Sequence, residues 1–68
     1  MRRVAAHEVV MPNGLIIAPG VIEICDSEVQ SVYPLEQELA YTEWVGGTVH
    51  ILCVNSRLQA YKNNNVLI

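Results

Sequence analysis

The alternation of apolar and polar positions between residues 20 and 34 predicts a β-hairpin. β-branched and aromatic residues dominate both arms, and the polar pair Asp26-Ser27 separates them. Pro34 ends the second arm. A two-residue turn would be tighter with glycine at position 27, so we expect Ser27 to adopt a left-handed backbone conformation or to require a bulge.

Shorter apolar runs before this hairpin predict two further strands. Residues 2–11 predict the first, and neither of its faces is polar, so we expect it to be covered on much of both. Strict alternation assigns its side chains to the two faces as follows: Val4, Ala6, Glu8 and Val10 on one, Ala5, His7, Val9 and Met11 on the other. Pro12-Asn13-Gly14 predicts a turn, and residues 15–17 predict a short second strand.

The second half of the chain predicts a loop and then three more strands. Residues 35–41 hold helix-forming residues in a run too short for more than one helical turn. Gly46-Gly47 predicts a flexible point or a bulge. Strands are expected at residues 48–54, 58–61 and 66–68, with turns at residues 55–56 and 63–65. A helix over residues 57–62, capped by Ser56, is the alternative there, although the run is short and three asparagines follow it.

These elements predict one small all-β domain over residues 1–68. The chain has no strand–helix–strand alternation, so the sheets are expected to be antiparallel or mixed. About six or seven short strands separated by frequent turns are typical of a small β-sandwich or a partly open barrel.

Composition adds the prediction of a contact with another chain. Of the 68 residues, 51% are hydrophobic and 16% are charged, and phenylalanine is absent, so the core must be built mainly from Val, Ile and Leu. This is more apolar material than one small core readily hides, which indicates that some apolar surface meets a partner. We therefore expect a homo-oligomer.

Charge and hydropathy argue against two classes of partner. The net charge is −3 with four basic residues, which is the wrong balance for a nucleic-acid-binding protein. No run approaches the ~20 apolar residues of a membrane span, and His7 and Glu8 interrupt any signal-peptide core after Arg2-Arg3. The sequence thus predicts a soluble, cytoplasmic protein with no membrane or nucleic-acid partner.

Three segments resemble the N-terminal strands of amidohydrolase-superfamily enzymes: residues 12–14, 20–24 and 26–32. Trp44-Val45-Gly46-Gly47-Thr48-Val49 resembles the strand that follows in those enzymes, so the resemblance covers roughly residues 4–52. It implies the small β-sandwich, or composite domain, that packs beside the catalytic (β/α)₈ barrel of the family.

The departures from this family bear on activity. Ser27 replaces the turn glycine, Leu52-Cys53-Val54 stands where the family has Pro-Gly, and the His-x-His metal motif is missing. No catalytic or metal-binding residue of the family is therefore carried over. The resemblance implies a fold, and it makes a hydrolase barrel on another chain a conceivable partner.

Two sets of side chains have the residue types of a chemical site. His7, Cys25, His50 and Cys53 are zinc-ligand types, but the odd separation of His50 and Cys53 sends them to opposite faces of a strand. Cys25 or Cys53 with His50 could form a nucleophile–base pair, although no motif places them together. We therefore expect two buried free thiols and two histidines at a sheet edge or interface, with no metal, no cofactor and no catalysis.

The remaining candidates are acidic or aromatic. The acidic residues of the central region predict a solvated face without calcium-loop spacing: Asp26, Glu28, Glu36, Glu38 and Glu43. Trp44, close to Tyr41 and followed by two glycines, could cover the core, anchor a protein partner or stack on a ligand.

Together these observations predict a non-catalytic structural or interaction module that forms a homo-oligomer. The candidate contacts are the C-terminal strand and the tryptophan region: Val66, Leu67, Ile68, Tyr41 and Trp44. Two alternatives remain, namely an accessory subunit of a metal-dependent hydrolase and a small-ligand binder using the Trp44 region.

Overall fold

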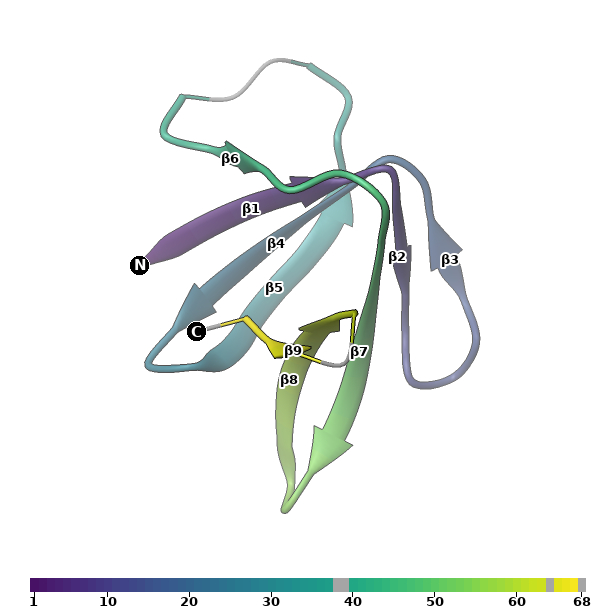
Figure 1. The fold of residues 1–68 in the computed structure, drawn as a ribbon, viewed down its shortest axis with the longest axis vertical. Helices are drawn as coiled ribbons and strands as arrows, with labels where there is room; N and C mark the ends of the chain where they lie inside the picture. The colour runs from purple at the N-terminus through teal and green to yellow at the C-terminus, as the bar shows by residue number, and fades with distance from the viewer. Residues whose placement is uncertain (38–39, 64, 68) are drawn as a thin grey trace.

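Two β-sheets packed face to face form the domain (Figure 1). The computed structural model describes residues 1–37, 40–63 and 65–67. In these residues it has the following nine strands: β1 Arg2–Ala6, β2 Glu8–Val10, β3 Ile16–Ile17, β4 Gly20–Cys25, β5 Glu28–Pro34, β6 Glu43–Trp44, β7 Thr48–Val54, β8 Arg57–Lys62 and β9 Asn65–Val66. One sheet has four strands in the order β5-β4-β1-β6, and the other has five in the order β3-β2-β7-β8-β9. The predicted all-β class, with mixed sheets in a small sandwich, is confirmed.

The prediction of one continuous first strand is wrong, because the chain breaks at His7 and changes sheets there. β1 pairs with β4 in the four-stranded sheet, and β2 pairs with β7 in the five-stranded sheet. Val4 and Ala6 face the core before the break, whereas Val9 faces it afterwards. The break resets the alternation, so apolar residues that strict alternation assigns to opposite faces line the same core.

A second segment changes sheets beside the first. β6 runs parallel to β1, and β7 runs parallel to β2, so the step from β6 to β7 repeats the change of sheets made at His7. The chain also returns to the four-stranded sheet between β3 and β4. Gly46 and Gly47, at φ 66° and 62°, provide the crossing from β6 to β7, in the position where the sequence predicted a bulge or flexible point. The division at His7 and the two-residue β6 raise the strand count to nine.

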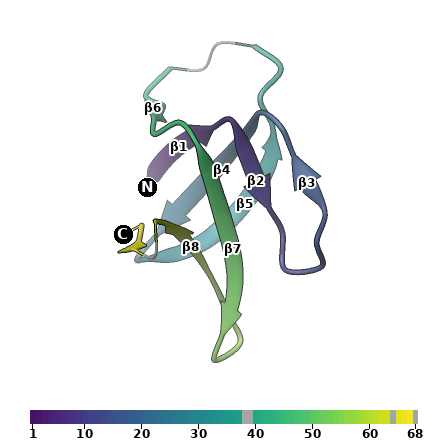
Figure 2. The ribbon, with the colours of Figure 1, turned by 45° about the vertical axis from the view of Figure 1, so that its right-hand side comes forward.

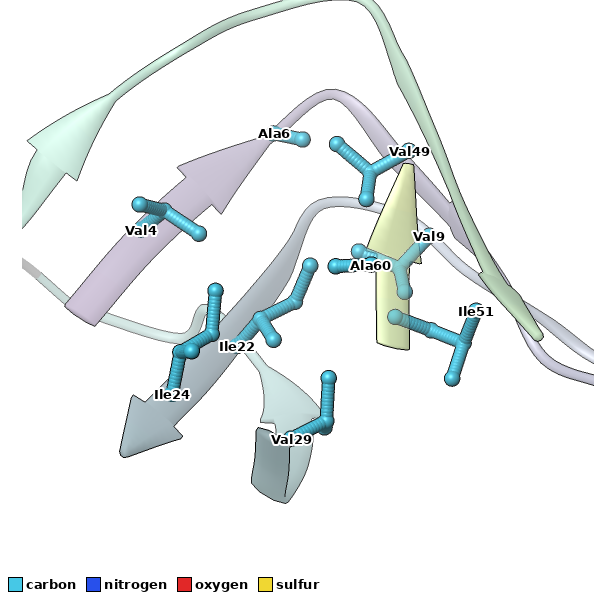
Figure 3. Packing of buried hydrophobic residues seen from close by; sticks show 9 residues of the cluster. All are labelled: Val4, Ala6, Val9, Ile22, Ile24, Val29, Val49, Ile51 and Ala60. Carbon is cyan, nitrogen blue, oxygen red and sulfur yellow. The ribbon is translucent and has the colours of Figure 1, made fainter. Parts of the chain in front are cut away.

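The core lies between the sheets and is almost entirely aliphatic (Figure 3). Val4, Ile22 and Ile24 project from the four-stranded sheet toward Val49 and Ile51 of the five-stranded sheet. These five side chains are at most 2% exposed. The prediction of a core built mainly from Val, Ile and Leu is therefore confirmed for valine and isoleucine, whereas leucine contributes only the half-buried Leu58 and Leu67.

The predicted turns form with the expected left-handed backbone. Asp26 and Ser27 join β4 to β5 at φ 53° and 66°, and a bulge near Ile24 shifts the register of the same hairpin. Asn55 and Ser56 join β7 to β8 in the same way, at φ 51° and 65°. Both turns therefore take positive φ without glycine.

The C-terminal half follows the extended alternative. Residues 57–62 form β8, and the described part of residues 35–41 contains no helix. β9 covers Asn65 and Val66 only, one residue earlier than the predicted final strand. Glu38, Leu39, Asn64 and Ile68 lie outside the described residues, so part of the predicted loop, turn and last strand does too.

Candidate functional site

The five-stranded sheet has a second face, away from the core, on which exposed aliphatic side chains lie among polar ones. β7 directs Val49 and Ile51 into the core, and His50, Leu52 and Val54 are exposed on the opposite side. β8 follows the same division, because Leu58 and Ala60 pack on the core while Gln59 between them faces outward. We call this surface the outer face. Its members are Glu8, Val10, Ile16, Thr48, His50, Leu52, Val54, Arg57, Gln59, Tyr61 and Val66.

One row of cross-strand partners spans the whole outer face. It runs from β3 to β9 through the following residues: Ile16, Val10, His50, Tyr61 and Val66. The residues at its two ends remain accessible, Ile16 at 53% and Val66 at 38%. Neighbouring side chains in such a row lie about 5 Å apart, so these residues form a continuous surface with a single imidazole at its centre.

Beside His50 the outer face is hollowed. An open depression of about 810 Å³ is lined by Thr48, His50, Leu52, Tyr61 and Asn63. The Tyr61 hydroxyl donates a hydrogen bond of 2.7 Å to Gln59 Oε1, and the Thr48 hydroxyl donates one of 3.0 Å to Glu8 Oε1. These bonds satisfy two polar groups of the face internally, which leaves it better suited to an apolar contact than its composition alone indicates.

The β7–β8 hairpin extends the outer face past the body of the sandwich. Its tip lies beyond the other strands in both views (Figure 1 and Figure 2). Leu52 is 47% exposed and Val54 is 37% exposed on the outer face, and Cys53 is exposed on the opposite side of the strand. The tip therefore presents apolar side chains that its own core does not cover.

Two charged residues mark opposite ends of the outer face. Glu8 pairs with Thr48 at the start of β7, and Arg57 pairs with Val54 at its end. They lie on the strands that flank β7 on its two sides, β2 and β8. The face thus has a centre of mixed aliphatic, aromatic and imidazole side chains, with one acidic and one basic end.

Trp44 lies elsewhere, at the corner where the chain changes sheets. Its indole meets the His7 ring edge to face, with centroids 4.8 Å apart and planes at 79°. His7 Nδ1 also accepts a hydrogen bond of 2.9 Å from the Gly47 amide. Trp44 is 53% exposed and packs on this imidazole, so it does not cover the core. Tyr41 is 98% exposed on the segment before β6.

The five residues predicted as an interface are distributed over different parts of the fold. Val66 lies on the outer face, whereas Leu67 is half-buried against the core and donates its amide to the Ala60 carbonyl at 2.7 Å. Trp44 belongs to the edge strand of the other sheet, and Ile68 lies outside the described residues.

Sequence reasoning did not select the most exposed aliphatic residues of the outer face, which are Ile16 and Leu52. The signal that could have found Leu52 is present in residues 48–54, which are apolar on both sides apart from His50. A strand with two apolar faces needs a cover on each of them.

The zinc and nucleophile candidates are placed apart. Cys25 ends β4 in one sheet, and His50 belongs to β7 in the other. Cys53 and His50 point to opposite faces of β7, as their odd separation predicts. Both thiols are free, but the expectation that both are buried is wrong, because Cys53 lies on the projecting hairpin and is exposed. Within residues 1–37, 40–63 and 65–67, no three His, Cys, Asp or Glu side chains are grouped as a metal would require.

A polar cluster occupies the far side of the four-stranded sheet. Glu23 Oε2 accepts hydrogen bonds from the Tyr33 hydroxyl at 2.9 Å and from Arg3 Nε at 3.1 Å. Burial raises the pKa of the Tyr33 hydroxyl above its ordinary value of 10.0, the Glu23 carboxylate adds to this rise, and the Arg3 guanidinium opposes it. The arrangement is that of a structural ion pair with a tyrosine attached.

The predicted acidic face is partly paired. Glu43 forms an ion pair of 3.0 Å with Arg2, and Asp26 and Glu36 are exposed. Glu28 is half-buried at the start of β5, and Glu38 lies outside the described residues.

No protein-family model, curated protein or solved structure matches this chain. Within the part of the chain that the structure describes, no helical segment has the length and apolarity needed to span a bilayer.

Proposed function

We propose that this domain is a non-catalytic interaction module that binds a protein chain through the outer face of its five-stranded sheet. The observation that carries the proposal is the row from Ile16 through His50 to Val66, which crosses all five strands. Contiguous exposed apolar patches of this kind on small soluble domains are typical of protein–protein contacts.

The composition of the outer face supports a protein partner. Its centre combines aliphatic side chains with Tyr61 and His50, and its ends carry Glu8 and Arg57. An apolar, charge-depleted centre with a polar rim is the usual anatomy of a protein interface. Tyrosine is also frequent among the residues that contribute most to binding.

The positions of the reactive side chains support the non-catalytic part of the proposal. A nucleophile needs a base within hydrogen-bond reach, but Cys25 and His50 belong to different sheets and Cys53 faces away from His50. The proposal also accommodates the resemblance to the amidohydrolase composite domain, a sandwich that serves its enzymes by packing beside a barrel.

Site-specific photo-crosslinking of the protein inside the cells that express it tests this function. A photo-reactive phenylalanine derivative in place of Leu52, on the outer face, should give adducts of discrete mass. The same group in place of Gln30, which is exposed on β5 of the other sheet, should give none. Adducts from both positions, or from neither, would contradict a specific interface on the outer face.

A further inference from the structure

We infer that the occupant of the outer face is a second copy of this chain, related by a two-fold axis in the plane of the face. This inference rests on the proposed function and specifies its partner. The two copies of β7 would run in roughly opposite directions, crossed by the tens of degrees that are usual for packed sheets.

The size of the outer face fits a weak dimer. β7 has seven residues and β8 six, but β2 has three and β3 and β9 have two each. At about 3.3 Å per residue and about 4.8 Å between strands, these strands cover about 320 Å² of flat sheet, so the pair would bury more than about 640 Å² once side-chain relief is included. That area lies at the small end of protein interfaces and fits a dimer that forms at high concentration.

The row of cross-strand partners is suited to self-association. His50 lies at its centre, with an apolar or aromatic residue on each side: Val10 and Tyr61. A two-fold axis that lies along the row close to His50 therefore places each of these residues near the same residue of the other copy, so that Val10 meets Val10, Tyr61 meets Tyr61 and the two imidazoles meet at the axis. Such self-complementarity is what an isologous interface requires.

Charge complementarity favours one direction of docking. Glu8 lies on β2, beside the first residue of β7. Arg57 lies on β8, beside the last residue of β7. Reversing β7 across the two-fold axis brings Glu8 of one copy toward Arg57 of the second copy, and this happens twice in the dimer. A parallel arrangement would instead bring like charges toward each other, which is unfavourable.

The first experiment is the solution mass of the purified chain by light scattering over a concentration series. We expect a mass of twice the 7.6 kDa of one chain at high concentration. Leu52→Glu should make the protein monomeric, because it replaces one of the most exposed aliphatic side chains of the face with a carboxylate. Gln30→Glu adds the same charge on the other sheet and should leave the dimer intact. Both positions are exposed, so both variants are expected to fold. Circular dichroism would check that they do.

Charge reversal tests the docking direction. Glu8→Arg and Arg57→Glu should each raise the dimer dissociation constant about five- to tenfold, and the double variant should return it to within about twofold of the parent value. Glu8→Gln removes the charge but retains an oxygen that can accept the hydrogen bond from the Thr48 hydroxyl. Comparing it with Glu8→Arg therefore separates the effect of the charge from the effect of losing this hydrogen bond.

The outcomes distinguish this inference from the proposed function. A monomer at all concentrations, combined with Leu52 adducts of another mass, would overturn the second copy as the occupant and leave the interface standing. An adduct much heavier than two chains would point to a large subunit such as a hydrolase barrel. A dimer that survives Leu52→Glu, or a double charge reversal that fails to restore it, would place the contact elsewhere or in another direction.

Discussion

The ionisation of the Tyr33 hydroxyl, which donates a hydrogen bond to Glu23, should affect the stability of the fold at high pH. The folded state retains the Tyr33 proton more tightly than the unfolded chain does, because burial and the Glu23 carboxylate raise the pKa of its hydroxyl above 10.0. A raised pKa of this kind contributes stability at pH values below 10.0, and the contribution is lost as pH rises from there toward the folded pKa.

Replacing Glu23 tests this account. Glu23→Gln should lower the pKa of Tyr33, because it removes the charge and the strong acceptor while burial remains. Ultraviolet absorbance of the phenolate during an alkaline titration measures the change, and Tyr33→Phe identifies the signal. Glu28→Gln, a matched change on β5, should leave that signal in place. Identical titrations of Glu23→Gln and the parent would mean that the carboxylate does not act on Tyr33.

At the scale of elements, the contact between Gly20 and Val9 joins the start of β4 to the middle of β2. A Cβ built on Gly20 would lie 2.5 Å from Val9 Cγ2 and 3.1 Å from the Ile17 carbonyl oxygen. Gly20 does not have the positive φ of the turn glycines, so it is required by space rather than by backbone conformation. The two strands approach closely because no side chain separates them.

Gly20→Ala should therefore reduce the free energy of unfolding by about 1–3 kcal/mol through overpacking. Val9→Ala should reduce it by about 2 kcal/mol through the cavity it leaves. The double variant should be more stable than the sum of the two losses predicts, because the shortened Val9 side chain makes room for the new methyl group. Urea denaturation measures the free energy of unfolding of the two single variants and the double variant. If the loss in the double variant equals the sum of the two single losses, the contact between Gly20 and Val9 is contradicted.

At the scale of the whole molecule, stability and association should be linked. A domain of 68 residues has little stability of its own, and a dimer that dissociates on unfolding gains stability by mass action. The proposed dimer predicts a melting temperature that rises by about 5 °C for each tenfold increase in protein concentration.

Scanning calorimetry at several concentrations checks this prediction. Leu52→Glu should melt at a lower temperature that does not depend on concentration, whereas Gln30→Glu should keep the dependence. A melting temperature of the parent protein that is constant across the series would argue that the folded chain does not self-associate.

The hairpins were predictable from the sequence because their signals are local. Asp26-Ser27 separates two runs rich in β-branched residues, and Asn55-Ser56 follows the apolar run of residues 48–54. A two-residue turn needs no information from distant parts of the chain. The candidate site was only partly predictable. Surplus apolar residues indicated that a contact exists, but Trp44, the most prominent aromatic residue, packs on His7 at a corner away from the outer face.

The sequence by itself determined the all-β class, most of the strands, the left-handed turns and the aliphatic core, because these depend on alternation and on the residues that adjoin each turn. Only the tertiary structure decided that the chain changes sheets at His7, that β1 and β2 pair in parallel with β6 and β7, and which apolar face remains outside. The physical reason is that, when both faces of a strand are apolar, its own sequence does not indicate which face will pack on the core. That choice follows from long-range pairing of strands about forty residues apart.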